Sequence, residues 1–187
     1  MNIYALPKSA FIGGTEYEIN GDFRDVLEII EYLNDTSRPE FIRWQIAMGL
    51  FYEGEIPEQY HREAMEYLSE FISYGEAAGR LSPKLIDWKQ DAQIIIGDVN
   101  KVAGREVREA SFLHWWTFLS YFYGIGEGQL STVISIRSKK SSGKKLEKWE
   151  ETYYKKNKHK IDFQKPKTQE DTAAQEYFNK WLGGGNT

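Results

Sequence analysis

Cysteine is absent from this chain of 187 residues. Its absence excludes disulfide bonds, thiolate chemistry and metal sites with cysteine ligands. No apolar run approaches the roughly 20 residues that are needed to span a bilayer. The first residues, Met1 to Tyr4, lack the basic and apolar regions of a signal peptide. We therefore expect no membrane segment, and a reducing cytoplasm as the location of the protein.

Histidine is also scarce, with three scattered residues, and no Ser–His–Asp arrangement or carboxylate pair stands out. Asp87, Asp91 and Asp98 share one face of a predicted helix, but Ile94 lies in the middle of that face. A Mg²⁺ or Ca²⁺ site would need further oxygen ligands, so a solvated helix face is favoured. We expect a protein that is not an enzyme, with no catalytic residue, no metal and no cofactor.

Aromatic residues, by contrast, are abundant, at 15% of the chain, and include six Trp. Aromatic side chains supply the buried area that offsets the entropy lost on ordering, so the chain is expected to fold. Its length is sufficient for one domain with a real core, with or without a tail.

The net charge of −4 is distributed unevenly. Residues 137–187 carry 13 Lys and Arg against 7 Asp and Glu, whereas residues 1–136 carry 11 against 21. An acidic body with a basic tail favours electrostatic contact between copies or with a partner. An equally good interpretation is a solubilising body with a solvated tail.

The start of the chain is typical of a β-hairpin. Residues 9–12 and 15–19 flank Gly13-Gly14, a dipeptide that can adopt the positive φ of a tight hairpin turn. An isolated hairpin is barely stable, so this one is expected to pack on the rest of the protein.

Helical periodicity follows. Asp22 is a good N-cap for a first helix, and Phe23 and Leu27 lie on its apolar stripe. Further helices are predicted over residues 39–51, 60–74, 83–103, 111–123 and 129–138. The expected fold class is therefore mainly α, a compact helical bundle with an N-terminal β-hairpin and a basic helical C-terminal extension.

The predicted helix 111–123 is apolar almost all round, which indicates burial. His114 lies inside it and must find a polar partner if it is buried. We expect an interhelical contact between His114 and Asp91. The residues predicted for the structural core are Phe23, Leu27, Ile95, Trp115, Trp116 and Leu119.

The composition changes after the core. We divide the chain into a core domain over residues 1–138, a Lys-rich helical extension over 139–160, and a linker with a short terminal helix over 161–187. Nucleic-acid binding by the extension is disfavoured, because its lysines alternate with glutamates. The candidate partner-binding residues are Trp149, Tyr153, Phe178 and Trp181. The terminal helix either docks in a groove on a neighbour or folds back on its own core.

Four segments of the chain resemble one bacteriophage family, the gene-product-fifteen family of siphophages. The resemblance covers roughly residues 5–137 and extends over the Lys-rich stretch to about residue 163. The His-Trp-Trp motif is its most specific part. The segments are Asp22-Phe23-Arg24-Asp25-Val26-Leu27, Asp91-Ala92 with Ile94-Ile95-Ile96, Leu113-His114-Trp115-Trp116 with Phe118-Leu119, and Ile134 with Ile136-Arg137. Residues 102–107 and Gly21 depart from the family's usual pattern.

The resemblance implies a tail-assembly chaperone that binds the phage tape measure protein while the tail tube polymerises. It also implies contact with the major tail protein, self-association, a location in the cytoplasm of the infected or lysogenic host, and absence from the mature virion. The resemblance brings no catalytic residues. Two other hypotheses remain, namely a structural head–tail or tail component of the virion and a nucleic-acid-binding phage regulator.

Overall fold

The computed structural model describes residues 4–74 and 84–164. These residues contain seven α-helices and one two-stranded sheet, so the predicted fold class is confirmed. The elements in chain order are β1 (Ser9–Ile12), β2 (Thr15–Glu18), α1 (Phe23–Asn34), α2 (Glu40–Phe51), η1 (Glu58–Tyr60), α3 (His61–Ile72), α4 (Ala92–Ala103), η2 (Val107–Glu109), α5 (Trp115–Tyr123), α6 (Gln129–Ser141) and α7 (Lys148–Ile161).

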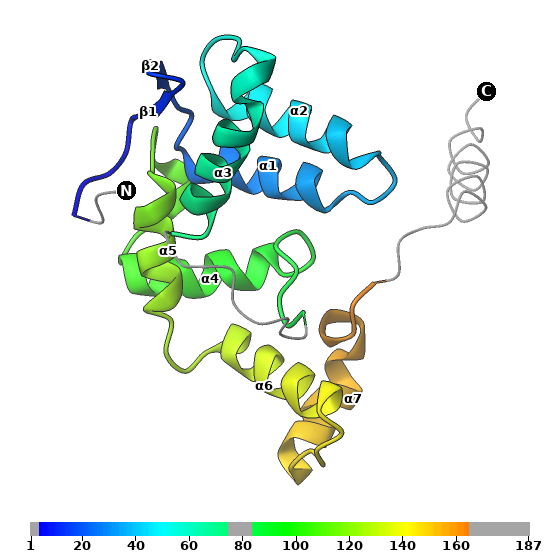
Figure 1. The fold of residues 1–187 in the computed structure, drawn as a ribbon. Helices are drawn as coiled ribbons and strands as arrows, with labels where there is room; N and C mark the ends of the chain where they lie inside the picture. Colours follow the sequence, from blue (N-terminus) through cyan, green and yellow to red (C-terminus); the bar gives the residue numbers. More distant parts are fainter. Residues whose placement is uncertain (1–3, 75–83, 165–187) are drawn as a thin grey trace, which may run out of the picture.

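The helices are arranged in two parts that α4 and α5 connect (Figure 1). In this view the hairpin, α1, α2 and α3 form the upper part, whereas α6 and α7 form the lower part. Helix α1 packs on α2 and α5, α4 packs on α5 and α6, and α6 packs on α7. None of the helices in the two described ranges is long and apolar enough to cross a bilayer.

The hairpin forms as its turn residues predict. Ile12 pairs with Thr15, so only Gly13 and Gly14 lie between the strands, and their φ angles are 58° and 80°. Positive φ at both positions is what a two-residue turn of this type requires. The Ala10 and Ile12 side chains are buried, so one face of the hairpin packs on the helices and the other faces solvent.

Aromatic side chains form the centre of the core. The Phe23 ring stacks on Phe118 at a centroid distance of 4.6 Å, and Phe118 in turn stacks on Trp115. The indole N–H groups of Trp115 and Trp116 donate to the carbonyl oxygens of Ile72 and Phe71, at 3.0 and 2.9 Å. These carbonyls lie at the end of α3, where a helix supplies few donors, so each indole donates to a polar group on another element. The Phe71 carbonyl also accepts the backbone N–H of Tyr74, at 3.3 Å.

The side chains predicted for the core lie in or against this cluster. Five of them are buried and Leu27 is partly buried, packed against the cluster. A smaller cluster, built on Val133, Ile136 and Ile161, joins α6 to α7.

Two helices begin later than their periodicity predicts. Helix α4 begins at Ala92 instead of near residue 83, because the Asp87 carboxylate accepts hydrogen bonds from the backbone N–H groups of Lys89 and Gln90 and holds this stretch in turns. Helix α5 begins at Trp115 instead of Ser111, since His114 is held outside the helix by its antiparallel bridge to Asp22 and serves as the N-cap.

The C-terminal part also departs from the expected limits. Helix α6 continues to Ser141, across the proposed domain boundary at residue 138. Ile161, placed at the start of a linker by sequence, is the buried last residue of α7.

Candidate functional site

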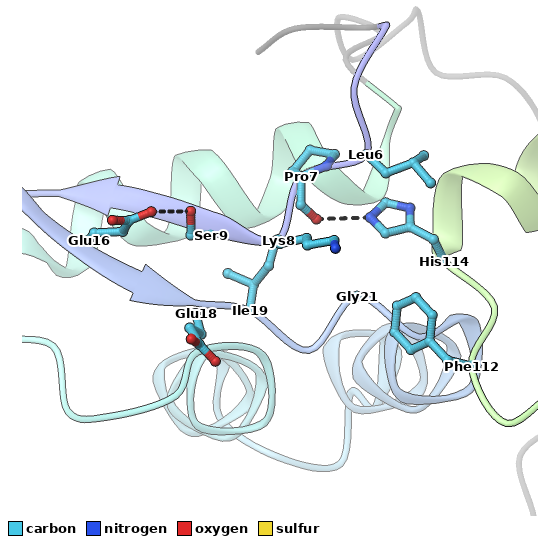
Figure 2. A pocket seen from close by; sticks show the side chains of 10 residues that line it. All are labelled: Leu6, Pro7, Lys8, Ser9, Glu16, Glu18, Ile19, Gly21, Phe112 and His114. Carbon is cyan, nitrogen blue, oxygen red and sulfur yellow. Dashed lines mark hydrogen bonds between the residues drawn. The ribbon is translucent and has the colours of Figure 1, made fainter.

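A groove with a volume of about 690 Å³ opens between the hairpin and the segment that leads into α5 (Figure 2). The N-terminal segment forms one wall and the residues before α5 form the opposite wall. The residues that line it are Leu6, Pro7, Lys8, Ser9, Glu16, Glu18, Ile19, Gly21, Phe112 and His114.

Two backbone segments that are distant in sequence are joined beneath this groove. The backbone N–H of Phe23 donates to the carbonyl of Leu113 at 2.9 Å, and that of Trp115 donates to the carbonyl of Gly21 at 2.8 Å. This short antiparallel bridge brings the start of α1 and the start of α5 together. It therefore fixes the side chains of residues 112 and 114 relative to the hairpin.

The Asp22 carboxylate strengthens this junction from both sides. It accepts hydrogen bonds from the backbone N–H and the guanidinium of Arg24, and from the backbone N–H of Leu113 at 2.8 Å. Burial alone would raise the pKa of Asp22, but the hydrogen bonds from Arg24 and Leu113 outweigh it and lower the pKa below its ordinary value. The charged carboxylate is thus at once the N-cap of α1 and the link to α5.

His114 is buried at the floor of the groove, where its two ring nitrogens have different partners. Nδ1 accepts the backbone N–H of Trp116 at 3.1 Å, so Nε2 carries the proton and donates to the carbonyl of Pro7 at 3.0 Å. Burial lowers the pKa of His114, which favours the same neutral form. A Cβ at Gly21 would lie 3.2 Å from the imidazole ring, so glycine at this position allows the close approach.

The rim of the groove is apolar and exposed. Leu6 and Phe112 are 49% and 58% exposed. Phe11, which is 66% exposed and does not line the groove, lies on the outer face of the hairpin opposite Glu16. Glu16 and Glu18 give the same face an acidic character. This combination can hold the apolar stripe of a helix whose flanks are basic or neutral.

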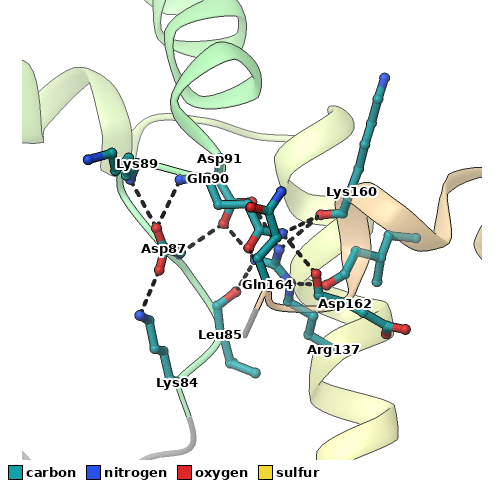
Figure 3. Close-up of polar contacts among 11 residues, drawn as sticks. Lys84, Leu85, Asp87, Lys89, Gln90, Asp91, Arg137, Lys160, Asp162 and Gln164 are labelled. Carbon is teal, nitrogen blue, oxygen red and sulfur yellow. Dashed lines mark hydrogen bonds and ion pairs between the residues drawn. The ribbon is translucent and has the colours of Figure 1, made fainter. Parts of the chain in front are cut away.

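A second polar centre lies at the junction of α4, α6 and α7 (Figure 3). The Arg137 guanidinium donates to both carboxylate oxygens of Asp91, at 2.6 and 2.9 Å. Its other N–H groups donate to the carbonyl oxygens of Leu85, Lys160 and Ile161, at 2.9, 3.1 and 2.7 Å. All five N–H donors of this arginine are therefore used.

The Arg137–Asp91 pair holds α4, α6 and α7 together. Arg137 and Asp91 are both buried, and Asp91 also accepts the backbone N–H of Asp87 at 2.9 Å. Lys160 and Ile161 lie at the end of α7, where carbonyls have no donor within the helix, so Arg137 caps α7 while it holds the start of α4. The Gln90 side-chain amide also donates to the Lys160 carbonyl, at 3.2 Å.

The three aspartates that share a predicted helix face have separate partners. Asp98 accepts the Lys101 ammonium and the backbone N–H of Leu130, whereas Asp91 pairs with Arg137. Within residues 4–74 and 84–164, no group of three or more acidic or histidine side chains is placed to hold a metal ion.

Comparison with known proteins identifies the family of the chain. The model of the family described as Bacteriophage Gp15 protein matches residues 4–163, which is most of the chain. The chain belongs to this family. The resemblance predicted from the His-Trp-Trp motif and its companion segments is thereby confirmed. No curated protein and no solved structure matches the chain.

In this Gp15 family member the predicted pair of Asp91 and His114 does not form, and that prediction was wrong. Asp91 binds Arg137, whereas His114 binds the backbone of residues 7 and 116. The prediction failed because it treated residue 114 as part of a helix that packs on α4. Residue 114 precedes α5 instead, as its N-cap.

The predicted partner-binding residues of the Gp15 chain lie in different surroundings. Trp149 is 58% exposed at the start of α7, whereas Tyr153 is partly buried against the small α6–α7 cluster. Phe178 and Trp181 lie outside the described residues.

Sequence reasoning assigned no role to Arg137 in this family member and counted it with the basic residues of the tail. A signal was present, because Leu130, Val133 and Arg137 follow one another at a spacing of three and four. An arginine on the apolar stripe of a helix is either a buried ion-pair partner or a solvated exception, and only the fold shows which.

Proposed function

We propose that this protein is a non-enzymatic tail-assembly chaperone that binds the phage tape measure protein while the tail tube is built. Membership of the Bacteriophage Gp15 protein family supports a role in a phage. The proposal adds the partner, the stage of assembly and the location, which is the cytoplasm of the infected or lysogenic host.

The observation that carries the proposal is the groove with its exposed apolar rim. A tape measure is a long helical chain, and its apolar stripes would aggregate if they stayed uncovered. Leu6 and Phe112 stand on either side of a hollow that can receive one such stripe, as in other helix-in-groove complexes. The Asp22 junction holds the backbone beside Phe112, so little ordering of this wall is needed on binding.

A chaperone of this kind must also dissociate from the tape measure protein as the tail tube grows. The groove is open and its rim is small, which favours weak binding by each copy. Many copies along one tape measure chain can still cover it, because their individual affinities combine. Growing tail tube, made of major tail protein, would then displace the copies one after another. The protein is accordingly expected to be absent from finished virions.

Co-expression with the tape measure protein tests the proposal. We expect the wild-type chain to keep the tape measure in the soluble fraction and to co-purify with it. Phe112→Asp and Leu6→Asp should abolish both effects, because each replaces an apolar side chain at the contact with a charge that the apolar stripe of the partner cannot solvate. Phe41→Asp is the matched control, since Phe41 is 64% exposed on α2 and does not line the groove. Equal loss of solubility with all three variants, or with none, would contradict the proposal.

Mass spectrometry of purified particles separates a chaperone from a structural component of the head–tail joint or tail. A chaperone is absent from particles or present far below one copy per tail. Stoichiometric recovery in every preparation would instead support the structural role.

A further inference from the structure

The two ends of the molecule carry opposite charge. Residues 53–70, which run from the loop after α2 to α3, hold six glutamates and one arginine. Residues 137–164, from the end of α6 through α7, hold ten Lys and Arg against four Asp and Glu. The loop that follows α2 is at the top of Figure 1 and α7 is at the bottom. Among residues 4–74 and 84–164, the two charged ends lie too far apart to meet within one copy, so a second copy can supply the complement of each.

The acidic end contains a hollow of about 480 Å³ between the end of α2 and the start of α3. Met48 and Ile56 are buried and form its apolar floor, while Glu55 and Glu58 are exposed at its edge. Neither glutamate makes an ion pair within the described ranges. The carbonyl end of α2 adds a partial negative charge at the same place. An apolar side chain flanked by cations matches this hollow.

The basic end offers such a side chain. Trp149 is 58% exposed on α7, and Lys156 lies two turns further along the same helix face. Lys148 is exposed beside the tryptophan. Neither lysine forms an ion pair with any residue that the structure describes. Exposed tryptophans are enriched among the residues that dominate interface energies.

We propose that the protein assembles head to tail, with Trp149 of one copy inserted in the hollow of the next. Lys148 and Lys156 then face Glu55 and Glu58 of the neighbouring copy. Because the contact joins two unlike surfaces at opposite ends, it leaves one surface of each kind free and continues beyond two copies. This inference goes beyond the proposed function, since it involves neither the groove nor the tape measure.

Sedimentation velocity of the full chain tests the assembly directly. The wild-type protein should form species larger than dimers as its concentration rises at low salt. Raising the salt should disperse them, because the charges are at the surface. Trp149→Ala should weaken self-association by about thirtyfold, the loss typical of a central tryptophan at an interface.

A mixing experiment makes the test specific. The double variant Glu55→Lys/Glu58→Lys keeps Trp149 but reverses the charge at the edge of the hollow. Trp149→Ala keeps the hollow with its acidic edge but removes the side chain that would enter it. Each alone should be monomeric, and an equimolar mixture should form a one-to-one dimer that grows no further. The variant Glu28→Lys/Glu127→Lys is the matched control, with two exposed glutamates changed outside the hollow, and should assemble like the wild type.

Melting curves like that of the wild type would show that the exposed substitutions leave the fold intact. A wild-type chain that stays monomeric at every concentration would overturn the proposal. So would a Trp149→Ala variant that assembles normally, or a mixture that stays monomeric or grows past the dimer.

Discussion

At the scale of single residues, the buried polar side chains of this protein each hold two segments together. His114 connects the N-terminal segment to α5, and Asp22 connects α1 to the residues before α5. Arg137 and Asp91 connect α4, α6 and α7. In a low-dielectric interior, a polar or charged group without its partner lowers the free energy of unfolding. Substitution of one member of a buried pair should therefore destabilise the protein far more than substitution in a surface pair.

Replacing Arg137 by Met should therefore destabilise the protein strongly. It leaves the Asp91 carboxylate buried without a counter-charge, and breaking such a pair costs about 3–5 kcal/mol in the free energy of unfolding. Urea unfolding measures the change. Arg38→Met, which removes a surface pair with Asp35, serves as the control and should cost less than about 1 kcal/mol. Equal effects of the two substitutions would show that the buried pair contributes no more to the free energy of unfolding than the surface pair.

His114 should make stability depend on pH in mildly acidic solution. Its pKa is lowered in the folded protein because burial disfavours the charged ring, so the unfolded chain binds the proton more tightly. The stability contributed by the neutral ring is complete above the ordinary histidine pKa of about 6.5 and is lost as the pH falls below it.

A comparison of His114→Gln with the wild type isolates this contribution, since all other titrating groups are common to both. The free energy of unfolding, measured between pH 7.5 and 5.5, should fall more steeply for the wild type. Parallel curves would mean that His114 does not titrate differently in the two states.

At the scale of elements, the starts of two helices depend on each other. Asp22 is the N-cap of α1, and His114 is the N-cap of α5. The backbone bridge between these two residues means that neither helix start can shift alone. The groove is built on this junction, so the position of its Phe112 wall depends on these two helix caps.

The variant Asp22→Ala should thus cost more than an ordinary cap. The lost cap accounts for about 1 kcal/mol, and the buried N–H of Leu113, left without its acceptor, adds about 1–3 kcal/mol. Asp35→Ala, at the other end of α1 and near the surface, is expected to cost about 1 kcal/mol or less. Thermal unfolding of the two variants would reveal whether the junction carries this extra weight.

At the scale of the whole molecule, the groove and the charged ends occupy different surfaces. The groove lies beside the hairpin, the acidic hollow lies at the end of α2, and the anchor is on α7. A protein that coats a long chain needs contacts of both kinds, one to the chain and one to the next copy. Separate surfaces allow both contacts at the same time.

The two proposed contacts, one to the tape measure and one between copies, should accordingly be separable by substitution. Phe112→Asp should lose tape measure binding and retain self-association, whereas Trp149→Ala should retain binding of single copies and lose assembly. Co-purification and sedimentation velocity on both variants provide the four readouts. If each substitution removed both contacts, one surface would be serving both.

The sequence by itself determined the family, the hairpin, the order of the helices and the apolar helix faces that form the core. These follow from local signals, such as Gly13-Gly14 at the turn and the apolar spacing around Trp115, which act over a few residues. Only the tertiary structure decided the polar partners and the groove. Arg137 lies 46 residues from Asp91, and the Asp22 carboxylate lies 91 residues from the N–H of Leu113. At such separations a side chain's partner depends on how whole helices pack, and several pairings satisfy the same charges equally well until packing selects one.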